Sequence, residues 1–207
     1  MARHKEFEPT QALEKAMWLF WQKGYNATSI GDLVEATGVQ RYGLYSTFGD
    51  KHALFLQALD HYLEAWVGLM VKELEDEQAD WSTVYSFFHQ FQQMEQFEDL
   101  KIGCLMCNSA TELALHDTAV ATKMDLYETR LKTLFEKAIR NAQSQGQLGL
   151  HVAPEKGGVY LVGIAVGLFT LSKTPMLTEG LVDYINTTLE GLHALSLSKD
   201  NQSPIAG

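Results

Sequence analysis

The sequence of 207 residues lacks the features of secreted, membrane-spanning and disulfide-bonded proteins. It turns polar at Arg3 and has no early apolar stretch of the kind that forms a secretory signal. The longest apolar run, residues 159–171, is shorter than the ~20 residues that a transmembrane helix needs. Two cysteines, Cys104 and Cys107, are too few and too close for a disulfide framework. We therefore expect a cytoplasmic protein without a membrane partner.

Positive charge is also scarce. The chain has 16 Lys and Arg against 26 Asp and Glu, a net charge of -10, which taken alone argues against nucleic acid because phosphates bind basic side chains. Residues 1–52, however, hold six basic and six acidic residues, and residues 53–207 hold ten against twenty. Because the acidic excess lies entirely in the second part, the charge distribution permits a DNA-binding N-terminus on an acidic body.

Strand signals are missing too, since no stretch alternates β-branched and polar residues. Apolar residues recur at helical spacing throughout, which predicts an all-α fold of about nine helices. The first three are short: one over 10–23, one that opens at Thr28-Ser29 and stops at Gly38, and one over 40–48. The others are predicted over 51–78, 81–94, 104–116, 117–145, 154–172 and 178–197. Residues 198–207 are expected to form a disordered tail.

Local end signals support the first helices. Pro9 stands at the entry of the first helix and Gly24 at its end. Ser29 and Asp32 have the spacing of a capping box, with Asp in place of the usual Glu. Gly38 is placed to adopt the positive φ of a tight turn. Residues 28–48 thus have the parts of a helix-turn-helix that reads DNA, although an ordinary helical corner inside a bundle has the same parts.

The residues of this segment favour the DNA-reading interpretation. From Thr28 to Leu54 they read T-S-I-x-D-L-x-x-A-T-G-V-x-x-x-x-L-Y-x-x-F-x-x-K-x-x-L, preceded by Ala16, Phe20 and Gly24-Tyr25. This pattern closely resembles the N-terminal signature of TetR-family repressors. The resemblance implies three parts: a helix-turn-helix DNA-binding domain over 1–52, a helical effector-binding and dimerisation domain over 53–197, and the tail. It implies no cofactor.

The resemblance also implies roles for residues on the DNA. The helix from Gln40 would enter the major groove, where Arg41 can bind guanine bidentately, Gln40 can read adenine, and Tyr42 can meet a thymine methyl. Thr28, Tyr45 and Lys51 match positions that contact phosphate in the family. Tyr45 could instead pack inside the three-helix unit, whereas Leu44 and Phe48 are expected in the core.

Aromatic and methionine side chains are dense in the second part. Such a stripe is often core, yet helical bundles also place apolar ligand cavities between helices. The residues that we predict to contact a small, largely apolar effector are Tyr62, Trp66, Phe88, Phe91, Cys104, Cys107, Asn108 and Tyr127.

The two cysteines allow a second reading. Cys104 and Cys107 share one helical face near a predicted helix N-terminus, whose dipole lowers a thiol pKa. A regulator that responds to oxidants or electrophiles through these thiols is one interpretation, and two small buried side chains are the other. A zinc site has no second pair of ligands at suitable spacing.

Small residues in the last two helices indicate a helix-packing face. Gly163 and Gly167 let another helix approach closely, and Leu181, Ile185 and Leu189 form a stripe on the last helix. We expect these residues in a four-helix interface between two copies of the chain, with an internal hairpin as the alternative. No catalytic triad, nucleophile elbow or phosphate loop is recognisable, so an enzyme is not expected. A helical adaptor that binds protein instead of DNA is the remaining alternative to a repressor.

Overall fold

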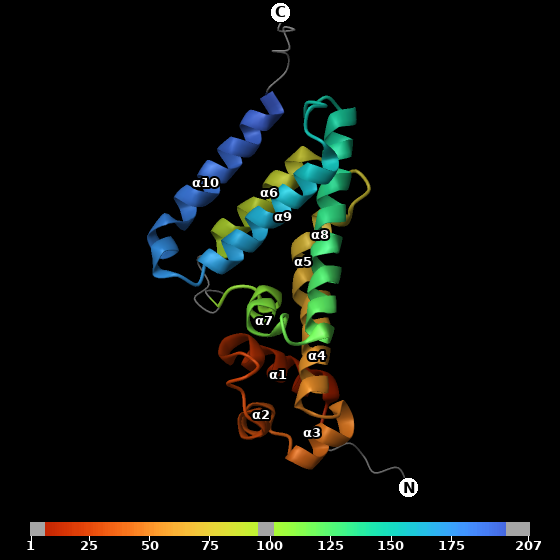
Figure 1. Ribbon diagram of the computed structural model, residues 1–207, viewed down its shortest axis with the longest axis vertical. Helices are drawn as coiled ribbons and strands as arrows, with labels where there is room; N and C mark the ends of the chain where they lie inside the picture. Colours follow the sequence, from red (N-terminus) through yellow and green to blue (C-terminus); the bar gives the residue numbers. More distant parts are fainter. Residues whose placement is uncertain (1–6, 95–101, 198–207) are drawn as a thin grey trace, which may run out of the picture. The chain divides into compact units, whose positions relative to one another are not determined.

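The computed structural model describes residues 7–94 and 102–197, and side chains within most of that range. Its described residues form nine helices and no strand, which confirms the predicted all-α class. These are α1 (Pro9–Lys23), α2 (Ile30–Thr37), α3 (Arg41–Phe48), α4 (Lys51–Tyr62) continued through a π-helical turn (Leu63–Val67) into α5 (Gly68–Glu75), α6 (Trp81–Met94), α7 (Leu105–Leu113), α8 (Thr118–Ser144), α9 (Pro154–Leu171) and α10 (Pro175–Leu197) (Figure 1). The predicted tail, 198–207, lies outside the described residues.

Helix ends follow the local signals in the sequence. Pro9 opens α1, and Gly24 ends it with φ 83°. Ser29 is the N-cap of α2: its hydroxyl accepts from the Asp32 N–H, and the Asp32 carboxylate accepts from the Ser29 N–H, so the capping box is complete. Gly38 ends α2 in the left-handed conformation, with φ 73°. These ends fix the lengths of the first helices.

The long helix predicted over 51–78 differs from the structure at two points. Its hydrogen-bond pattern widens to a π-helical turn at Leu63–Val67, and α5 ends at Glu75 rather than at Gln78. The early end has a local cause, because the Asp76 carboxylate accepts from the Gln78 N–H at 2.7 Å and bends the chain into a turn. Asp50 caps the start of α4 by accepting from the Ala53 N–H at 2.8 Å.

The chain divides into two compact units, drawn from Met1–Leu69 with Ile102–Tyr127 and from Met70–Lys101 with Glu128–Gly207. In the first unit, α1 packs against α2 and α4, and α3 joins them (Figure 1). Its core contains Phe20, Leu33, Leu44 and Phe55. These compact units do not coincide with the predicted DNA-binding and effector-binding domains. The predicted boundary between those domains, near residue 52, stays a prediction.

The second unit is built around α6, α9 and α10 with most of α8. Phe87 and Phe88 of α6 pack on Phe135 of α8 at ring separations of 5.2 and 6.0 Å, and Phe91 packs on Phe169 of α9 at 4.8 Å. α10 contacts both α6 and α9. Across the described ranges of both units, no helix has the length and apolarity needed to cross a membrane.

Candidate nucleic-acid interface and sensor residues

Hydrogen bonds of one side chain hold the turn between α2 and α3. The Thr37 hydroxyl donates to the Leu33 carbonyl at 2.6 Å and accepts from the Val39 N–H at 3.1 Å. Val39 is buried, as are Leu44 and Phe48 on the inner face of α3, which confirms that these two belong to the core. One side of α3 is therefore anchored in the core, and its opposite side is exposed over the described residues.

That opposite side begins with the predicted base-reading residues. Gln40, Arg41 and Tyr42 are all exposed, and Tyr42 keeps 79% of its surface accessible. Gln40 occupies the N-cap position of α3 without a side-chain capping bond, so its amide group is not engaged in capping. The three consecutive side chains can donate, accept and make apolar contacts, which are the interactions that base edges offer in the major groove.

Gly43 is a residue whose role the sequence pattern did not reveal. A Cβ at this position would lie 2.9 Å from Cγ1 of Val39 and 3.4 Å from the ring of Phe7. Glycine therefore lets α3 close against the turn that precedes it. A glycine inside an eight-residue helix is unfavourable by propensity, and this conflict is the signal that could have identified the position.

Tyr45 supports Arg41 from the next turn of α3. The guanidinium carbon of Arg41 lies 5.2 Å from the centroid of the Tyr45 ring, within the range of a cation–π contact. Tyr45 is half-buried. Its phosphate contact stays a prediction, and the structure adds a second role, because the ring orients the predicted guanine reader.

Lys51, the third predicted phosphate contact, lies over the ring of Tyr25 with Nζ 4.2 Å from the centroid. Partial burial lowers the pKa of Lys51, and the carboxylates of Glu112 and Asp32 offset part of this effect. Tyr25 packs on Phe55 of α4 with ring centroids 4.7 Å apart, so it fixes the aromatic surface beneath the ammonium group. The sequence pattern included Tyr25 without assigning it this function.

Thr28 is placed differently from the other predicted phosphate contacts. Only 1% of its surface is accessible, and its hydroxyl donates to the Gly24 carbonyl at 2.6 Å. Its N–H donates to the Tyr25 carbonyl at 3.3 Å. A phosphate contact by this side chain would require the hydroxyl to leave its internal partner, so the burial counts against the predicted role.

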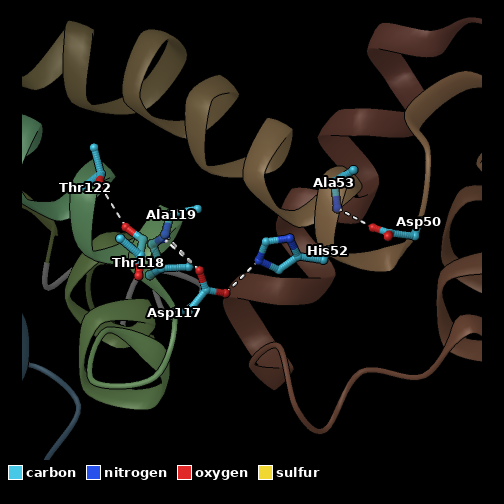
Figure 2. A network of polar contacts seen from close by, with 8 residues as sticks. Asp50, His52, Ala53, Asp117, Thr118, Ala119 and Thr122 are labelled. Atoms are coloured by element: carbon cyan, nitrogen blue, oxygen red, sulfur yellow. Dashed lines mark hydrogen bonds and ion pairs between the residues drawn. The ribbon is translucent and has the colours of Figure 1, made fainter.

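Two carboxylates that are distant in sequence reach the turn after α1 and the start of α4. Glu112 in the last turn of α7 accepts from the N–H groups of Tyr25 and Asn26, at 3.0 and 2.7 Å. Figure 2 shows the other, Asp117, between α4 and the start of α8: its Oδ2 lies 2.6 Å from Nε2 of His52, and its Oδ1 accepts from the Ala119 N–H at 3.0 Å. Both links lie inside the first unit.

Asp117 both caps α8 and contacts the ring of His52. Its partial burial raises the pKa, but the backbone N–H of Val120 and the ring of His52 lower it by more, so the pKa of Asp117 lies below its usual value. A carboxylate at the start of α8 also interacts favourably with the helix dipole. The charge of Asp117 therefore connects the stability of α8 to the start of α4.

Six of the eight predicted effector residues lie in the first unit. Tyr62, Cys104 and Tyr127 meet in its interior: the Tyr62 hydroxyl donates to Sγ of Cys104 at 3.5 Å, and that thiol lies 4.0 Å from the Tyr127 hydroxyl. Trp66 packs on Trp21 with ring centroids 5.5 Å apart. Asn108 donates to the Ile102 carbonyl at 2.9 Å. Cys107 completes the group.

The cysteines are buried, with 0% of Cys104 and 6% of Cys107 accessible. Burial by itself raises the pKa of the Cys104 thiol, but the Cys107 thiol, the Tyr62 hydroxyl and the backbone N–H groups of Cys107 and Met106 bring the net pKa below its ordinary value. A lowered thiol pKa and burial belong to the two alternative readings of the cysteines, and both occur at Cys104.

The remaining two predicted effector residues, Phe88 and Phe91, lie in the second unit. Both are buried in its aromatic core, where they stack on each other with ring centroids 6.3 Å apart. Within a single unit the structure therefore does not bring all eight residues together. An effector site that uses the complete set stays a prediction.

The predicted dimer residues differ in their exposure. A Cβ added to Gly163 would have no other atom within 4 Å of the kind that such a group could meet, so this position is open. A Cβ added to Gly167 would lie 3.6 Å from the Tyr184 hydroxyl. Ile185 and Leu189 are buried within the second unit, which counts against the predicted contact with a second copy. The side chain of Leu181 lies outside the described part of α10.

Other apolar side chains of these two helices are exposed. Val159 and Tyr160 on α9 each keep 58% of their surface accessible, and Val182 and Tyr184 on α10 are also exposed. Val159, Gly163 and Gly167 follow one another at intervals of four residues, so they share one face of α9. Both faces of α10 carry apolar residues, so the periodicity of the sequence could not distinguish the buried stripe with Ile185 and Leu189 from the exposed one.

Comparison with known proteins connects this geometry to a family. Residues 12–58 match the model of bacterial regulatory proteins, tetR family. The chain is 30% identical over 188 residues to the HTH-type transcriptional repressor ComR of Escherichia coli (strain K12), covering 90% of each chain. It is 28% identical over 193 residues to the uncharacterized HTH-type transcriptional regulator YezE of Bacillus subtilis (strain 168), covering 93% of this chain and 100% of YezE.

A solved structure shows the same fold. It is a cysteine mutant of the TetR family transcriptional regulator CifR complexed with 26-base-pair operator DNA, with a TM-score of 0.76 and 23% identity over 94% of this chain and 100% of that one. The matched segment at 12–58 contains α2, the turn and α3, and therefore the exposed residues Gln40, Arg41 and Tyr42. The chain therefore belongs to the TetR family of bacterial regulatory proteins and is a DNA-binding transcriptional regulator of the helix-turn-helix type.

Proposed function

We propose that this regulator is a homodimeric repressor that binds a palindromic operator and is released by a small, largely apolar effector. The observation that carries the proposal is the exposed row of Gln40, Arg41 and Tyr42 on a reading helix whose other face is buried. Relatives named as helix-turn-helix transcriptional repressors, and a neighbour complexed with operator DNA, support the sign and the target.

On the operator, the exposed row reads bases while neighbouring groups bind the backbone. Arg41 binds guanine O6 and N7, which contributes about 1–3 kcal/mol of discrimination, and Gln40 reads adenine. Tyr45 and Lys51 contact phosphates and thereby fix the register of the helix in the groove. We leave Thr28 out of this set, because its hydroxyl is buried against Gly24.

Dimerisation accounts for the palindrome. The exposed apolar residues of α9 and α10 form the face between two copies, and two-fold symmetry then places the two reading helices on equivalent half-sites. Such half-sites lie ~34–36 Å apart, one turn of DNA, or a small multiple of that distance. Effector binding in the helical body releases the DNA only if the ligand prefers a state in which the two helices no longer fit successive grooves.

Fluorescence anisotropy of the full chain on labelled DNA tests the proposal. The operator is taken from DNA upstream of the gene or, failing that, selected from random sequences. We expect the wild type to bind it roughly a thousandfold more tightly than random DNA, with an affinity that falls as salt rises. Binding that never exceeds the level of random DNA, after selection as well, would contradict a repressor and favour the helical adaptor.

A matched pair of variants localises the binding. Arg41→Ala should remove the preference for the operator and leave the thermal unfolding temperature unchanged, because Arg41 is exposed. Arg140→Ala is the control, since Arg140 is an exposed arginine of the second unit that pairs with Glu155 at 2.7 Å. Loss of operator binding in both variants would show a general charge effect in place of base reading.

A further inference from the structure

In the turn between α1 and α2, the N–H groups of Tyr25 and Asn26 donate to a distant side chain and not to a carbonyl of the turn. Gly24 has φ 83°, and this conformation directs the N–H groups of Tyr25 and Asn26 to one side. The carboxylate of Glu112 accepts from both, one oxygen for each, across 87 and 86 residues of sequence. A Cβ on Gly24 would lie 3.1 Å from Oε2 of Glu112, so the glycine also makes room for the carboxylate.

The same turn leads directly into the helix-turn-helix. The Thr28 hydroxyl and N–H donate to the carbonyls of Gly24 and Tyr25, at 2.6 and 3.3 Å. The next residue, Ser29, caps α2. A displacement of the turn therefore acts on Thr28 through its two hydrogen bonds, and on the N-cap Ser29 through the peptide bond that joins the two residues.

Tyr25 extends this connection to α4. Its ring lies against Phe55 and beneath Nζ of Lys51, at 4.7 and 4.2 Å. The charge of Glu112 acts on Lys51, whose pKa it raises against the effect of burial. Glu112 is thus close to a predicted phosphate contact, where a negative charge by itself repels DNA.

Further links hold the surroundings of Glu112 to the same helices. Nε1 of Trp21 in α1 donates to the Gly103 carbonyl at 2.9 Å, just before α7 begins. His52 in α4 binds Asp117, just after α7 ends. Both ends of α7 are therefore tied to the DNA-reading part of the first unit, and Glu112 is the tie that reaches the turn itself.

We propose that Glu112 is a positioning residue for DNA reading: by holding the N–H groups of Tyr25 and Asn26, it fixes the turn from which α2 and the reading helix start. This inference rests on the proposed function. It assigns Glu112 a favourable effect on operator binding that is opposite in sign to the effect of its charge. The opposite signs make the two effects separable by experiment.

The test uses Glu112→Gln and Glu112→Ala in the full chain, with Kd measured by anisotropy on the operator and on random DNA. Gln can accept from one N–H but presents an amide donor to the other, and it removes the charge. We expect the ratio of operator to random affinity to fall roughly 2- to 30-fold in both variants. Random-DNA affinity should stay constant or rise, because a negative charge near Lys51 has been removed.

Asp80→Ala is the matched control. Asp80 is a carboxylate of the second unit that also accepts from a backbone N–H, that of Ser82, at 2.9 Å. Its loss should lower stability without changing the affinity ratio. Amide hydrogen exchange in the chain without DNA gives an independent measure, since exchange at Tyr25 and Asn26 should accelerate in the Glu112 variants and stay slow in Asp80→Ala.

The outcomes separate the two proposals. A wild type that does not prefer its operator would overturn the proposed function. A wild type with that preference, together with Glu112 variants whose affinity ratio is unchanged, would overturn the positioning role alone. Operator and random affinities that rise by the same factor would also overturn it, because Glu112 would then act through its charge only.

Discussion

Arg41 shows how a single side chain is prepared for recognition. An exposed arginine loses rotamer freedom when it binds a base, and this loss opposes binding. The ring of Tyr45, 5.2 Å from the guanidinium carbon, limits that freedom before DNA arrives. The burial of Leu44 and Phe48 fixes α3, which also carries Arg41 and Tyr45. Recognition at this position therefore depends on packing on the opposite face of α3.

Gly24 gives a prediction about stability. Its φ of 83° and ψ of 164° belong to a region that only glycine adopts readily, and a Cβ would approach the Glu112 carboxylate. Gly24→Ala should lower the free energy of unfolding by about 1–3 kcal/mol. Chemical denaturation followed by circular dichroism measures the change.

Gly31→Ala is the control for this change. Gly31 lies in α2, where a Cβ would meet only the Ser29 hydroxyl at an ordinary 3.5 Å. Alanine there should raise the free energy of unfolding by about 0.5–1 kcal/mol, because it favours the helix. Equal destabilisation by both substitutions would contradict the special conformation of Gly24.

The thiols give a prediction about reactivity. Hydrogen bonds lower the pKa of Cys104, which favours the reactive thiolate, but 0% of Cys104 and 6% of Cys107 are accessible. Because a reagent must reach the sulfur, we expect the low accessibility of the two thiols to outweigh the effect of the lowered pKa on their reactivity. Neither cysteine should react with iodoacetamide in the folded chain, and both should react after unfolding, as measured by mass spectrometry. Rapid labelling of folded Cys104 would instead support the thiol-based regulator.

At the level of helices, the sequence predicts well wherever the cause of a structure is local. Pro9, Gly24, Gly38 and the capping box of Ser29 with Asp32 act within one turn of the chain, and α1 and α2 begin and end where these residues indicate. The aromatic periodicity of α6 likewise predicts its bounds, Trp81–Met94. Such signals depend on neighbours in sequence, so a single sequence contains them.

The rest of the candidate site depends on contacts that sequence spacing does not encode. Glu112 reaches Tyr25 across 87 residues, and nothing in its local pattern distinguishes it from an exposed helical glutamate. Thr28 has a hydroxyl that could donate to a phosphate, but in the folded chain this hydroxyl donates to the Gly24 carbonyl. The π-helical turn at Leu63–Val67 contains no Gly or Pro within its own five residues that would predict it.

The start of α8 gives a prediction about pH. Because the pKa of Asp117 is lowered in the folded chain, its carboxylate stabilises the fold above the ordinary pKa of Asp, about 4, and this stabilisation is lost as pH falls. Asp117→Ala should cost about 1–2 kcal/mol at neutral pH, through the lost cap and the lost partner of His52. Thermal unfolding of both proteins between neutral and acidic pH measures the difference.

The pH dependence distinguishes this account from simple loss of packing. The gap in stability between wild type and Asp117→Ala should narrow as pH falls below about 4, because the carboxylate is protonated first in the unfolded chain and, at lower pH, in the folded chain. His52→Ala serves as the comparison, because it removes the ring and leaves the cap on Ala119 and Val120 in place. A gap of constant size across the whole pH range would contradict the role of the charge.

For the whole molecule, charge is distributed in a way that suits one-sided DNA binding. Residues 1–52 have no net charge, whereas residues 53–207 hold ten basic and twenty acidic residues. The acidic part repels phosphates and leaves the N-terminal part as the favourable approach. Specific binding then relies on contacts of the reading helix more than on general attraction.

The exposed apolar face of α9 gives a prediction about assembly. Val159 is 58% accessible in the single chain, so Val159→Glu should fold normally. If this face joins two copies, symmetry brings the two introduced carboxylates into one interface, where like charges cost several kcal/mol. Analytical ultracentrifugation should then show monomers. Leu150→Glu, on a residue exposed to 84%, is the control that should remain dimeric.

The most direct test of the central claim, that α3 reads DNA sequence, is a double-mutant cycle between Arg41 and a guanine of the operator half-site. Anisotropy gives the four affinities of wild type and Arg41→Ala on the operator and on the base-substituted operator. We predict that substituting the guanine weakens wild-type binding by about 1–3 kcal/mol and leaves Arg41→Ala unaffected. Equal losses in both proteins at every guanine of the half-site would contradict base reading by Arg41.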